Sequence, residues 1–421
     1  MHSESLFIKP EIMRYKLSAP SQPKASIQLP ASKSISNRAL IIHALAKGAI
    51  VPGNLSDCDD TQVMIKALTE GNEVIDIMAA GTAMRFLTAY LSVTPGTRTI
   101  TGTARMQQRP ILILVNALRE LGAQIEYLGN EGYPPLRITG CRLSANEITL
   151  KGNVSSQYIS ALLMIGPVLE QGLTVHLTGD IISRPYINLT LQLMRDFGAA
   201  ADWCSDCSIR VQPQPYKDVP FTVESDWSGA SYWYQIAALS SAAEIELKGL
   251  FRNSYQGDSR GAEVFAKLGV ATEFTDNGVV LHKTGLKPER LDEDFIDIPD
   301  LAQTFVVTCA LLNIPFRFTG LQSLKIKETD RIAALIAEMA KLGYVLRDED
   351  NSVLLWDGER CQPQEVPVIK TYEDHRMAMA FSPAVICFPQ IRIDEPNVVT
   401  KSYPGYWDDL RSAGFLVELE D

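Results

Sequence analysis

The sequence has no long hydrophobic run. None of its windows approaches the roughly 20 apolar residues that a helix needs to cross a bilayer, and the N-terminus MHSESLFIKP lacks the apolar core of a signal peptide. The 7 cysteines are scattered, and an odd, dispersed set does not indicate a disulfide framework. Cys204 and Cys207 form a lone CxxC without a second Cys or His pair nearby, so we expect no metal site. These absences predict a cytoplasmic protein.

The chain also has no excess of basic residues over acidic ones. The 39 Lys and Arg residues are outnumbered by 50 Asp and Glu residues, which gives a net charge of −11. This balance argues against nucleic-acid or membrane partners, because both need a broad basic surface. A local cluster of cations can still bind a small anion, since charges at physiological salt act over about 8 Å.

Several common catalytic motifs are absent as well. The chain contains neither GxxxxGK[ST] nor GxGxxG, which argues against a P-loop NTPase and a dinucleotide-binding domain. It contains neither HExxH nor GxSxG, so zinc-protease and α/β-hydrolase interpretations lack their motifs.

What the chain does contain is an internal repeat. Six times, a short run of small or polar residues opens an apolar helix, at residues 32–34, 81–83, 155–157, 228–230, 299–300 and 374–376. In most copies a strand follows, then a polar loop, then a second amphipathic helix that ends at a glycine. These glycines, suited to the left-handed residue that closes a helix, are Gly122, Gly198, Gly269, Gly343 and Gly414. Six βαβαββ units predict an α/β (α+β) architecture of two globular domains with three units each.

The chain is expected to cross between the two domains twice. One boundary should fall at residues 224–227, after the third copy, and the Pro- and Ser-rich residues 18–30 resemble a second crossing. This predicts an inserted domain of residues 31–224 and a discontinuous domain of residues 1–30 plus 225–421, with the active site in the cleft between them. Paired crossings form a hinge that could close over a ligand. If the first helices of the units point at this cleft, their positive ends would bind anions there.

The most densely charged segment is KIKETDR at residues 325–331, directly before a helix. Such runs usually coat a solvated surface, but anions are favoured at a helix start. Thr329 or Asp330 is the expected N-cap. The helix itself is indicated by apolar residues at three- and four-residue steps, namely Ile332, Leu335, Ile336, Met339 and Leu342.

Other basic and hydroxyl residues lie at the junctions between repeats. A solvated side chain is the default interpretation for Lys33, and N-capping alone would explain one of the serines Ser155 and Ser156. Among the neighbouring residues, His375 could transfer protons, although the adjacent cation Arg376 disfavours its charged form. Trp227, Tyr232 and Trp233 are interpreted as core. The junction residues are Lys33, Ser34, Arg38, Arg85, Arg105, Arg109, Ser155, Ser156, Gln157, Arg376 and Lys401.

Taken together, these segments resemble the EPSP synthase (3-phosphoshikimate 1-carboxyvinyltransferase) family. The resemblance implies the enolpyruvyl transferase fold, an inside-out α/β barrel, in a monomer without metal or organic cofactor. It also implies transfer of the enolpyruvyl group of phosphoenolpyruvate to the 5-hydroxyl of shikimate 3-phosphate, with release of phosphate, on the shikimate pathway to chorismate and aromatic amino acids. The motifs, in family order, are SKSISNRA at 32–39, GTAMR at 81–85, RP at 109–110, SSQ at 155–157, SRPY at 183–186, KETDR at 327–331, DHRMAM at 374–379 and KSYP at 401–404.

The same resemblance assigns roles to individual residues. Proton transfer falls to Asp300, Glu328 and Lys33, and Glu328 must hold a proton when the substrate binds. Phosphoenolpyruvate is assigned to Lys33, Gly81, Arg109, Gln157, Arg331, Arg376 and Lys401, whose Arg forks match carboxylate and phosphate. Shikimate 3-phosphate is assigned to Lys33, Ser34, Arg38, Ser155, Ser156, Gln157, Ser183, Tyr186, Asp300, Ser323 and Lys327.

The chain departs from the family pattern at a few positions, and two rival functions stay open. Ala31, Ala79 and Phe86 replace residues common around the phosphoenolpyruvate pocket, and Ser323 replaces a frequent Asn that contacts shikimate 3-phosphate. One rival is an enolpyruvyl transferase acting on UDP-N-acetylglucosamine, but that family uses a loop Cys and residues 102–110 contain none. The other is a non-catalytic anion-binding protein, which would gain nothing from carboxylates beside its cations.

Overall fold

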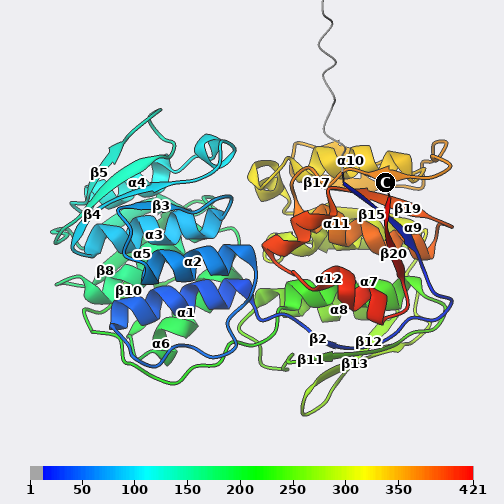
Figure 1. The fold of residues 1–421 in the computed structure, drawn as a ribbon, viewed down its shortest axis with the longest axis horizontal. Coiled ribbons are helices and arrows are strands. Elements are labelled where there is room, and N and C mark those ends of the chain that lie inside the picture. Colours follow the sequence, from blue (N-terminus) through cyan, green and yellow to red (C-terminus); the bar gives the residue numbers. More distant parts are fainter. Residues whose placement is uncertain (1–12, 421) are drawn as a thin grey trace, which may run out of the picture.

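The computed structural model describes residues 13–420 (Figure 1). Residues 1–12 and residue 421 lie outside the described residues. They belong to the predicted discontinuous domain, and residues 1–10 are the N-terminal stretch MHSESLFIKP. Within residues 13–420, no helix is both long enough and apolar enough to span a membrane.

The described strands form five separate four-stranded sheets. Two sheets, formed by strands within residues 74–211, have the orders β3-β4-β6-β5 and β7-β8-β10-β9. The other three have the orders β12-β13-β11-β2, β14-β15-β17-β16 and β18-β19-β1-β20. The strands are β1 (Arg14–Ser18), β2 (Lys24–Gln28), β3 (Val74–Asp76), β4 (Gly96–Thr101), β5 (Gln124–Tyr127), β6 (Leu136–Gly140), β7 (Glu147–Lys151), β8 (Leu173–Thr178), β9 (Ala201–Ser205), β10 (Ser208–Val211), β11 (Glu244–Lys248), β12 (Val270–Phe274), β13 (Gly278–Lys283), β14 (Leu291–Asp294), β15 (Phe316–Thr319), β16 (Arg347–Glu349), β17 (Val353–Trp356), β18 (Val368–Ile369), β19 (Ile391–Asp394) and β20 (Leu416–Glu420).

Each sheet contains one parallel pair and is otherwise antiparallel. In β3/β4, β7/β8, β14/β15 and β18/β19 a helix crosses between the two parallel strands, and a second helix follows. A hairpin completes the first three of these units, whereas in the fourth the single strand β20 follows the second helix. In the last sheet the N-terminal strand β1 inserts between β19 and β20, antiparallel to both. The predicted βαβαββ unit is therefore present, and the two ends of the chain meet in one sheet.

Helices fill the interior, and the sheets lie outside them (Figure 1). The helix α3 packs on α1 and α5, and α9 packs on α7 and α11. Because all ten residues of α9 are buried, this helix is apolar around its whole circumference, as expected of a central helix. The strands in the described part of the chain close no barrel, since helices rather than strands meet at the centre. The α-helices are α1 (Lys33–Ala46), α2 (Asp59–Thr69), α3 (Gly81–Val93), α4 (Leu112–Glu120), α5 (Ser156–Ile165), α6 (Arg184–Asp196), α7 (Trp227–Leu239), α8 (Gly261–Lys267), α9 (Ala302–Leu311), α10 (Arg331–Lys341), α11 (His375–Phe381) and α12 (Tyr406–Ser412).

The first repeat differs from the other five, because its strands are reduced to single bridges. Gly53 bridges Thr222 in parallel, and Ala31 bridges Ser225 in antiparallel orientation. Pro52 and Pro220 flank the first bridge. Proline has no N–H to donate to a ladder, which limits strand pairing there.

Two hydrophobic cores are present. The N-terminal core contains buried residues between Ala31 and Val223, and the C-terminal core contains Leu17, Ile27, Leu29 and buried residues from Trp227 to Val417. Trp227, Tyr232 and Trp233 are all buried in the C-terminal core, as predicted. The glycines expected to close the second helices all have positive φ, from 82° at Gly198 to 107° at Gly122.

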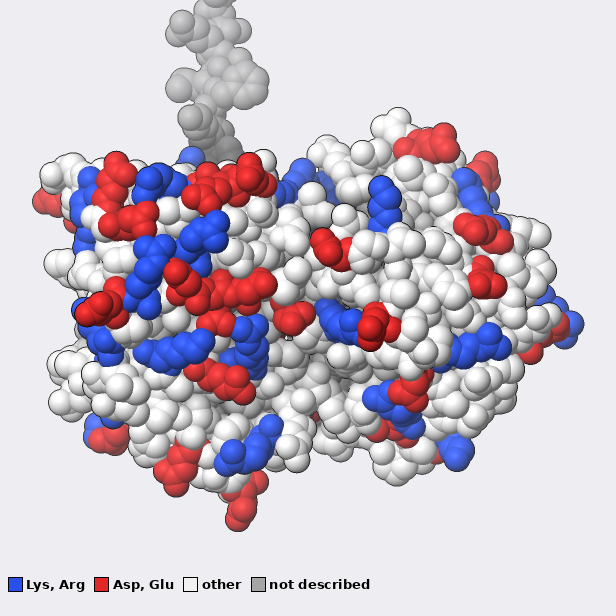
Figure 2. All heavy atoms as spheres, turned by 180° about the vertical axis from the view of Figure 1, so that it is seen from behind, with Lys and Arg blue, Asp and Glu red and all other residues white. Residues whose placement is uncertain are grey.

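The chain passes between the two cores at two adjacent segments. Ser32 N donates to Glu224 O at 2.8 Å, and Asp226 N donates to Pro30 O at 2.9 Å. The outgoing and returning segments are thus hydrogen-bonded to each other. Around them the surface carries charges of both signs: on the face in Figure 2, Lys and Arg alternate with Asp and Glu and form no broad basic area.

Candidate active site

A cavity of about 370 Å³ lies between the two cores. Its walls include the first turns of α1, α3, α5, α10 and α11, so the positive ends of these helices converge on it, as the repeat predicts. Every residue to which the sequence assigns a role lines this cavity except Lys401, whose Nζ lies 3.1 Å from the lining residue Glu328. The predicted residues that line it are Lys33, Ser34, Arg38, Gly81, Arg109, Ser155, Ser156, Gln157, Ser183, Tyr186, Asp300, Ser323, Lys327, Glu328, Arg331 and Arg376.

Arg331, the first residue of α10, connects three carboxylates. Its Nε donates to Asp374 Oδ2 at 2.7 Å, one terminal nitrogen donates to Asp300 Oδ1 at 3.1 Å, and the other donates to Glu328 Oε2 at 2.9 Å. The guanidinium is fully buried, and Asp374 is completely buried as well. Asp330 caps α10 by accepting from Ala333 N, and it also pairs with Lys325. Lys327, Glu328 and Arg331 of the charged segment at residues 325–331 therefore face the cavity, whereas Lys325 and Asp330 pair with each other and do not line it.

Asp300 lies in the short 3-10 helix η4 (Pro299–Leu301) and is surrounded by cations. Arg376 lies 2.9 Å from one carboxylate oxygen, and Arg331 and Lys327 lie 3.1 and 3.3 Å from the other. Burial alone would raise the pKa of Asp300, but these three cations hold it well below its usual value. The carboxylate is therefore ionised and can accept a proton.

Cations lower the pKa of Glu328, as they do for Asp300. Burial would raise its pKa, but Lys401, Arg331 and Arg109 hold the pKa well below its usual value. Glu328 is thus a carboxylate in this structure. The expectation that it carries a proton refers to the substrate-bound state, in which these cations would face anionic ligands.

Lys33 begins α1 and faces Asp60, with Nζ 3.5 Å from Oδ2. Burial lowers the pKa of Lys33, yet the nearby anionic groups, with Asp60 the foremost, raise it overall, so the ammonium stays charged. Sequence reasoning missed Asp60. The available signal was the adjacent pair Asp59 and Asp60 in the first turn of α2.

Gly81 and Arg109 are in close contact. A Cβ atom at position 81 would lie 2.6 Å from a terminal nitrogen of Arg109. Only glycine therefore leaves room for this guanidinium. Arg85 reinforces the same corner by donating to Gly81 O and Pro110 O.

The polar side of the cavity carries serines and an amide. Ser155 caps α5 by accepting from Gln157 N, as capping predicts for one serine, and Gln157 Nε2 donates to Thr82 Oγ1 at 3.1 Å. Ser183 has a left-handed φ of 55°, and its N–H donates to Ile296 O in the other half of the molecule. The buried Ser323 Oγ has no hydrogen-bond partner within residues 13–420.

Arg38 lines the cavity, but protein groups already occupy much of its guanidinium. Nε donates to Thr190 Oγ1 at 2.7 Å, and the terminal nitrogens donate to Ser34 O and Ser160 Oγ. Burial without a carboxylate partner lowers its pKa to about 10. The structure therefore gives Arg38 an internal hydrogen-bonding role that the sequence did not indicate.

Tyr186 and His375 are further polar groups on the cavity wall. The Tyr186 hydroxyl lies 3.4 Å from Asp300 Oδ2 and 3.4 Å from Asp258 Oδ1. Asp258, which sequence reasoning missed, is buried, and burial together with Asp300 raises its pKa to about 6. Burial, Lys33 and Arg376 hold the pKa of His375 well below its usual value, so its ring is neutral.

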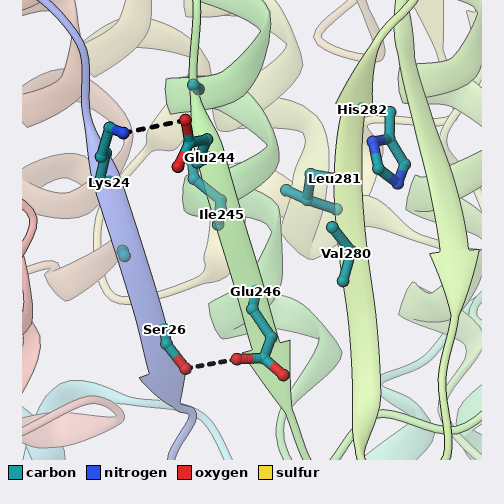
Figure 3. A pocket seen from close by; sticks show the side chains of 10 residues that line it. Lys24, Ser26, Glu244, Ile245, Glu246, Val280, Leu281 and His282 are labelled. Carbon is teal, nitrogen blue, oxygen red and sulfur yellow. Dashed lines mark hydrogen bonds and ion pairs between the residues drawn. The ribbon is translucent and has the colours of Figure 1, made fainter.

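A second hollow, of about 500 Å³, lies on the solvent face of the β12-β13-β11-β2 sheet (Figure 3). It contains a Lys24–Glu244 ion pair at 2.9 Å and a hydrogen bond from Ser26 to Glu246. None of the predicted site residues borders it. The chemistry-bearing residues thus gather in the cavity between the cores.

Comparison with known proteins agrees with this geometry. The model of the EPSP synthase (3-phosphoshikimate 1-carboxyvinyltransferase) family matches residues 17–70 and 68–410. The chain belongs to this family. A 3-phosphoshikimate 1-carboxyvinyltransferase of Bacteroides fragilis is 78% identical over 407 residues, covering 97% of this chain and 99% of that protein. One from Vibrio vulnificus is 35% identical over 420 residues, covering 93% and 96%.

Solved structures share the fold. An EPSP synthase from Acinetobacter baumannii superposes with a TM-score of 0.77 at 21% identity, covering 97% of this chain and 100% of that one. The enolpyruvyl transferase NikO from Streptomyces tendae gives a TM-score of 0.74 at 14% identity, covering 98% and 100%. The predicted fold class is confirmed. The predicted activity, transfer of the enolpyruvyl group of phosphoenolpyruvate to shikimate 3-phosphate, is confirmed by the family membership.

Proposed function

We propose that this transfer takes place in the cavity between the cores, with Glu328 as the acid and Asp300, assisted by Lys33, as the base. The observation that carries the proposal is the shared contact of Glu328 and Asp300 with one guanidinium, that of Arg331. This contact fixes the two carboxylates relative to each other and to a group that matches an anionic substrate.

Binding of phosphoenolpyruvate changes Glu328 from its ionised to its protonated form. In the free enzyme Lys401 and Arg331 keep Glu328 ionised. When the carboxylate and phosphate of the substrate pair with these cations, the cations stabilise the Glu328 carboxylate less. The burial of Glu328 then raises its pKa. Glu328 becomes protonated and can protonate the methylene carbon of phosphoenolpyruvate.

The remaining steps use Asp300 and then Glu328 again. Protonation leaves an oxocarbenium-like carbon, which the 5-hydroxyl of shikimate 3-phosphate attacks as Asp300 accepts its proton, while the charged ammonium of Lys33 assists by stabilising the anionic substrates. The tetrahedral adduct expels phosphate, and the Glu328 carboxylate takes back a methyl proton. The departing phosphate takes the proton that Asp300 accepted, so Asp300 returns to its carboxylate form and Glu328 ends protonated, as it began the reaction, and no metal or organic cofactor enters the sequence.

The two substrates bind to different parts of the cavity wall. Cations from both cores and the amide of Gln157 bind phosphoenolpyruvate. Gly81 contributes by leaving space for the Arg109 guanidinium. The polar side binds shikimate 3-phosphate, and Ser323 Oγ, which has no hydrogen-bond partner in the described part of the chain, offers it a hydrogen bond in place of the family's usual Asn. The phosphoenolpyruvate set is Lys33, Gly81, Arg109, Gln157, Arg331, Arg376 and Lys401, and the shikimate 3-phosphate set is Lys33, Ser34, Arg38, Ser155, Ser156, Gln157, Ser183, Tyr186, Asp300, Ser323 and Lys327.

The two cores act as two domains that close over the substrates. The inserted domain comprises residues 31–224 and the discontinuous domain the remainder, with the paired crossings at residues 30–32 and 224–226 as the hinge. Contacts that cross the cleft include a hydrogen bond from Thr400 Oγ1 to Asp59 Oδ2 at 2.6 Å. One chain supplies both walls, so a single copy is sufficient for the site, and we infer that the enzyme acts as a monomer. Its free cysteines suit the reducing cytoplasm.

Phosphate release tests the proposal directly. Release from phosphoenolpyruvate should require shikimate 3-phosphate and should fall when Glu328 or Asp300 is replaced by its amide. Release that proceeds without shikimate 3-phosphate would refute the assignment, and so would release sustained by UDP-N-acetylglucosamine in its place.

A further inference from the structure

A tight turn lies directly before the site residues of α11. Asp374 N donates to Thr371 O at 2.9 Å, and the two residues between them, Tyr372 and Glu373, have φ values of 55° and 56°. Positive φ at both central residues together with this hydrogen bond defines a type I′ turn, which normally carries Asn, Asp or Gly. In Tyr and Glu the left-handed conformation is strained, so other contacts must hold this turn.

Glu338 supplies those contacts from α10. It is fully buried, and its Oε1 accepts from the Tyr372 hydroxyl at 2.7 Å. Its Oε2 accepts from Lys370 N at 3.0 Å and from Lys341 Nζ at 2.6 Å. Burial and the Glu338 carboxylate raise the pKa of Tyr372, so the hydroxyl keeps its proton and remains the donor. Both oxygens of a buried carboxylate are thus used to fix residues 370–372.

The same helix holds the far side of the turn. Arg331 precedes Glu338 by about two turns of α10, so both side chains leave the helix on one face. Arg331 binds Asp374 on one side of residue 373, and Glu338 binds Tyr372 on the other. Asp374 in turn caps α11 by accepting from Arg376 N at 2.9 Å.

We propose that Glu338 and Tyr372 form a positioning clamp, which keeps the strained turn closed and thereby sets Asp374, Arg331 and Arg376 for phosphoenolpyruvate. This inference rests on the proposed function, since Arg331 and Arg376 belong to its phosphoenolpyruvate set. Neither clamp residue lines the cavity. None of the proposed shikimate 3-phosphate ligands lies on residues 370–376, so loss of the clamp should affect one substrate selectively.

Tyr372→Phe tests the clamp by removing only the hydroxyl. We expect the KM for phosphoenolpyruvate to rise about tenfold, the effect of one lost hydrogen bond, while the KM for shikimate 3-phosphate changes less than about twofold. Tyr234→Phe is the matched control, because that buried hydroxyl also has a 2.7 Å partner, Thr272, and lies on α7 away from the cavity. It should leave both KM values unchanged.

A second substitution that relieves the backbone strain of the turn distinguishes a positioning role of Tyr372 from a general structural role. The Glu373 side chain is exposed, and glycine adopts positive φ freely. Adding Glu373→Gly to Tyr372→Phe should return the KM for phosphoenolpyruvate to within about threefold of wild type, whereas Glu373→Gln, which removes the charge alone, should not. An unchanged KM in Tyr372→Phe, an equal rise of both KM values, or no recovery with glycine would each overturn the clamp.

Amide hydrogen exchange tests the clamp without turnover. Peptides covering residues 370–377 should exchange faster in Tyr372→Phe and return toward wild-type rates with Glu373→Gly. Unchanged exchange there would overturn the clamp. Absence of turnover in the wild-type enzyme would instead refute the proposed function and leave this readout of the clamp intact.

Discussion

Lys401 Nζ lies 3.1 Å from Glu328 Oε1. The Lys comes from the short 3-10 helix η7 (Pro396–Lys401) and the Glu from the turn before α10, so two separate segments set the charge of the proposed acid. Because the same cation belongs to the proposed phosphoenolpyruvate set, substrate binding and the protonation of Glu328 are linked through it.

Replacing Glu328 with Gln should abolish proton transfer and preserve substrate binding. The amide keeps the size of the side chain but cannot deliver or retake a proton. We expect turnover to fall by at least about 100-fold, with the dissociation constant of shikimate 3-phosphate nearly unchanged by calorimetry. Glu263→Gln on α8 is a control at an exposed position outside the cavity. Wild-type turnover in the Glu328 variant would remove this residue from the chemistry.

Gly81→Ala should weaken phosphoenolpyruvate binding without unfolding the protein. The new Cβ would meet only the flexible end of Arg109, which can move aside, so the free energy of unfolding should change little. The displaced guanidinium should raise the KM for phosphoenolpyruvate about tenfold, as expected when one charged hydrogen-bonding group is misplaced. Gly53→Ala is the matched control, because its Cβ would meet nothing closer than 3.6 Å. Equal KM values in the two variants would contradict the role given to the Gly81 and Arg109 contact.

Closure of the two domains should be visible in solution scattering. Adding shikimate 3-phosphate and phosphoenolpyruvate together places anions between cations of both cores, which should draw the cores together and lower the radius of gyration. Inorganic phosphate at the same ionic strength serves as the control for salt effects. A radius of gyration that stays constant with both substrates would refute closure about the paired crossings.

The sequence predicted the elements that depend on local pattern. The repeat located the starts of the first helices, and some of the cavity residues lie at those starts because helix N-termini converge there. The cap Asp330 and the glycines that end the second helices were also predictable, since each follows from backbone chemistry within a few residues.

The missed features all depend on contacts between distant segments. Asp374 was assigned only to a helix start, yet it holds Arg331 across 43 residues of sequence. The partners Asp60 and Asp258 were missed because tertiary packing, which no local pattern encodes, brings them to Lys33 and Tyr186. The turn at Tyr372 and Glu373 carries no Asn or Gly to mark it, because Glu338 rather than turn chemistry holds it.

Asp300 should stabilise the folded protein less as the pH becomes acidic. Its pKa in the folded protein lies well below the ordinary value of 3.8 that applies when unfolded, because Arg376, Lys327 and Arg331 outweigh the effect of burial. A carboxyl with a depressed folded-state pKa contributes stability above its unfolded pKa and loses it as pH falls toward the folded value. Protonated Asp300 resembles Asn, so the difference in unfolding free energy between wild type and Asp300→Asn should shrink as pH is lowered from about 6 to about 3. Urea denaturation across this range measures the difference, and a gap that stays constant or widens would show that Asp300 is not held ionised by these cations.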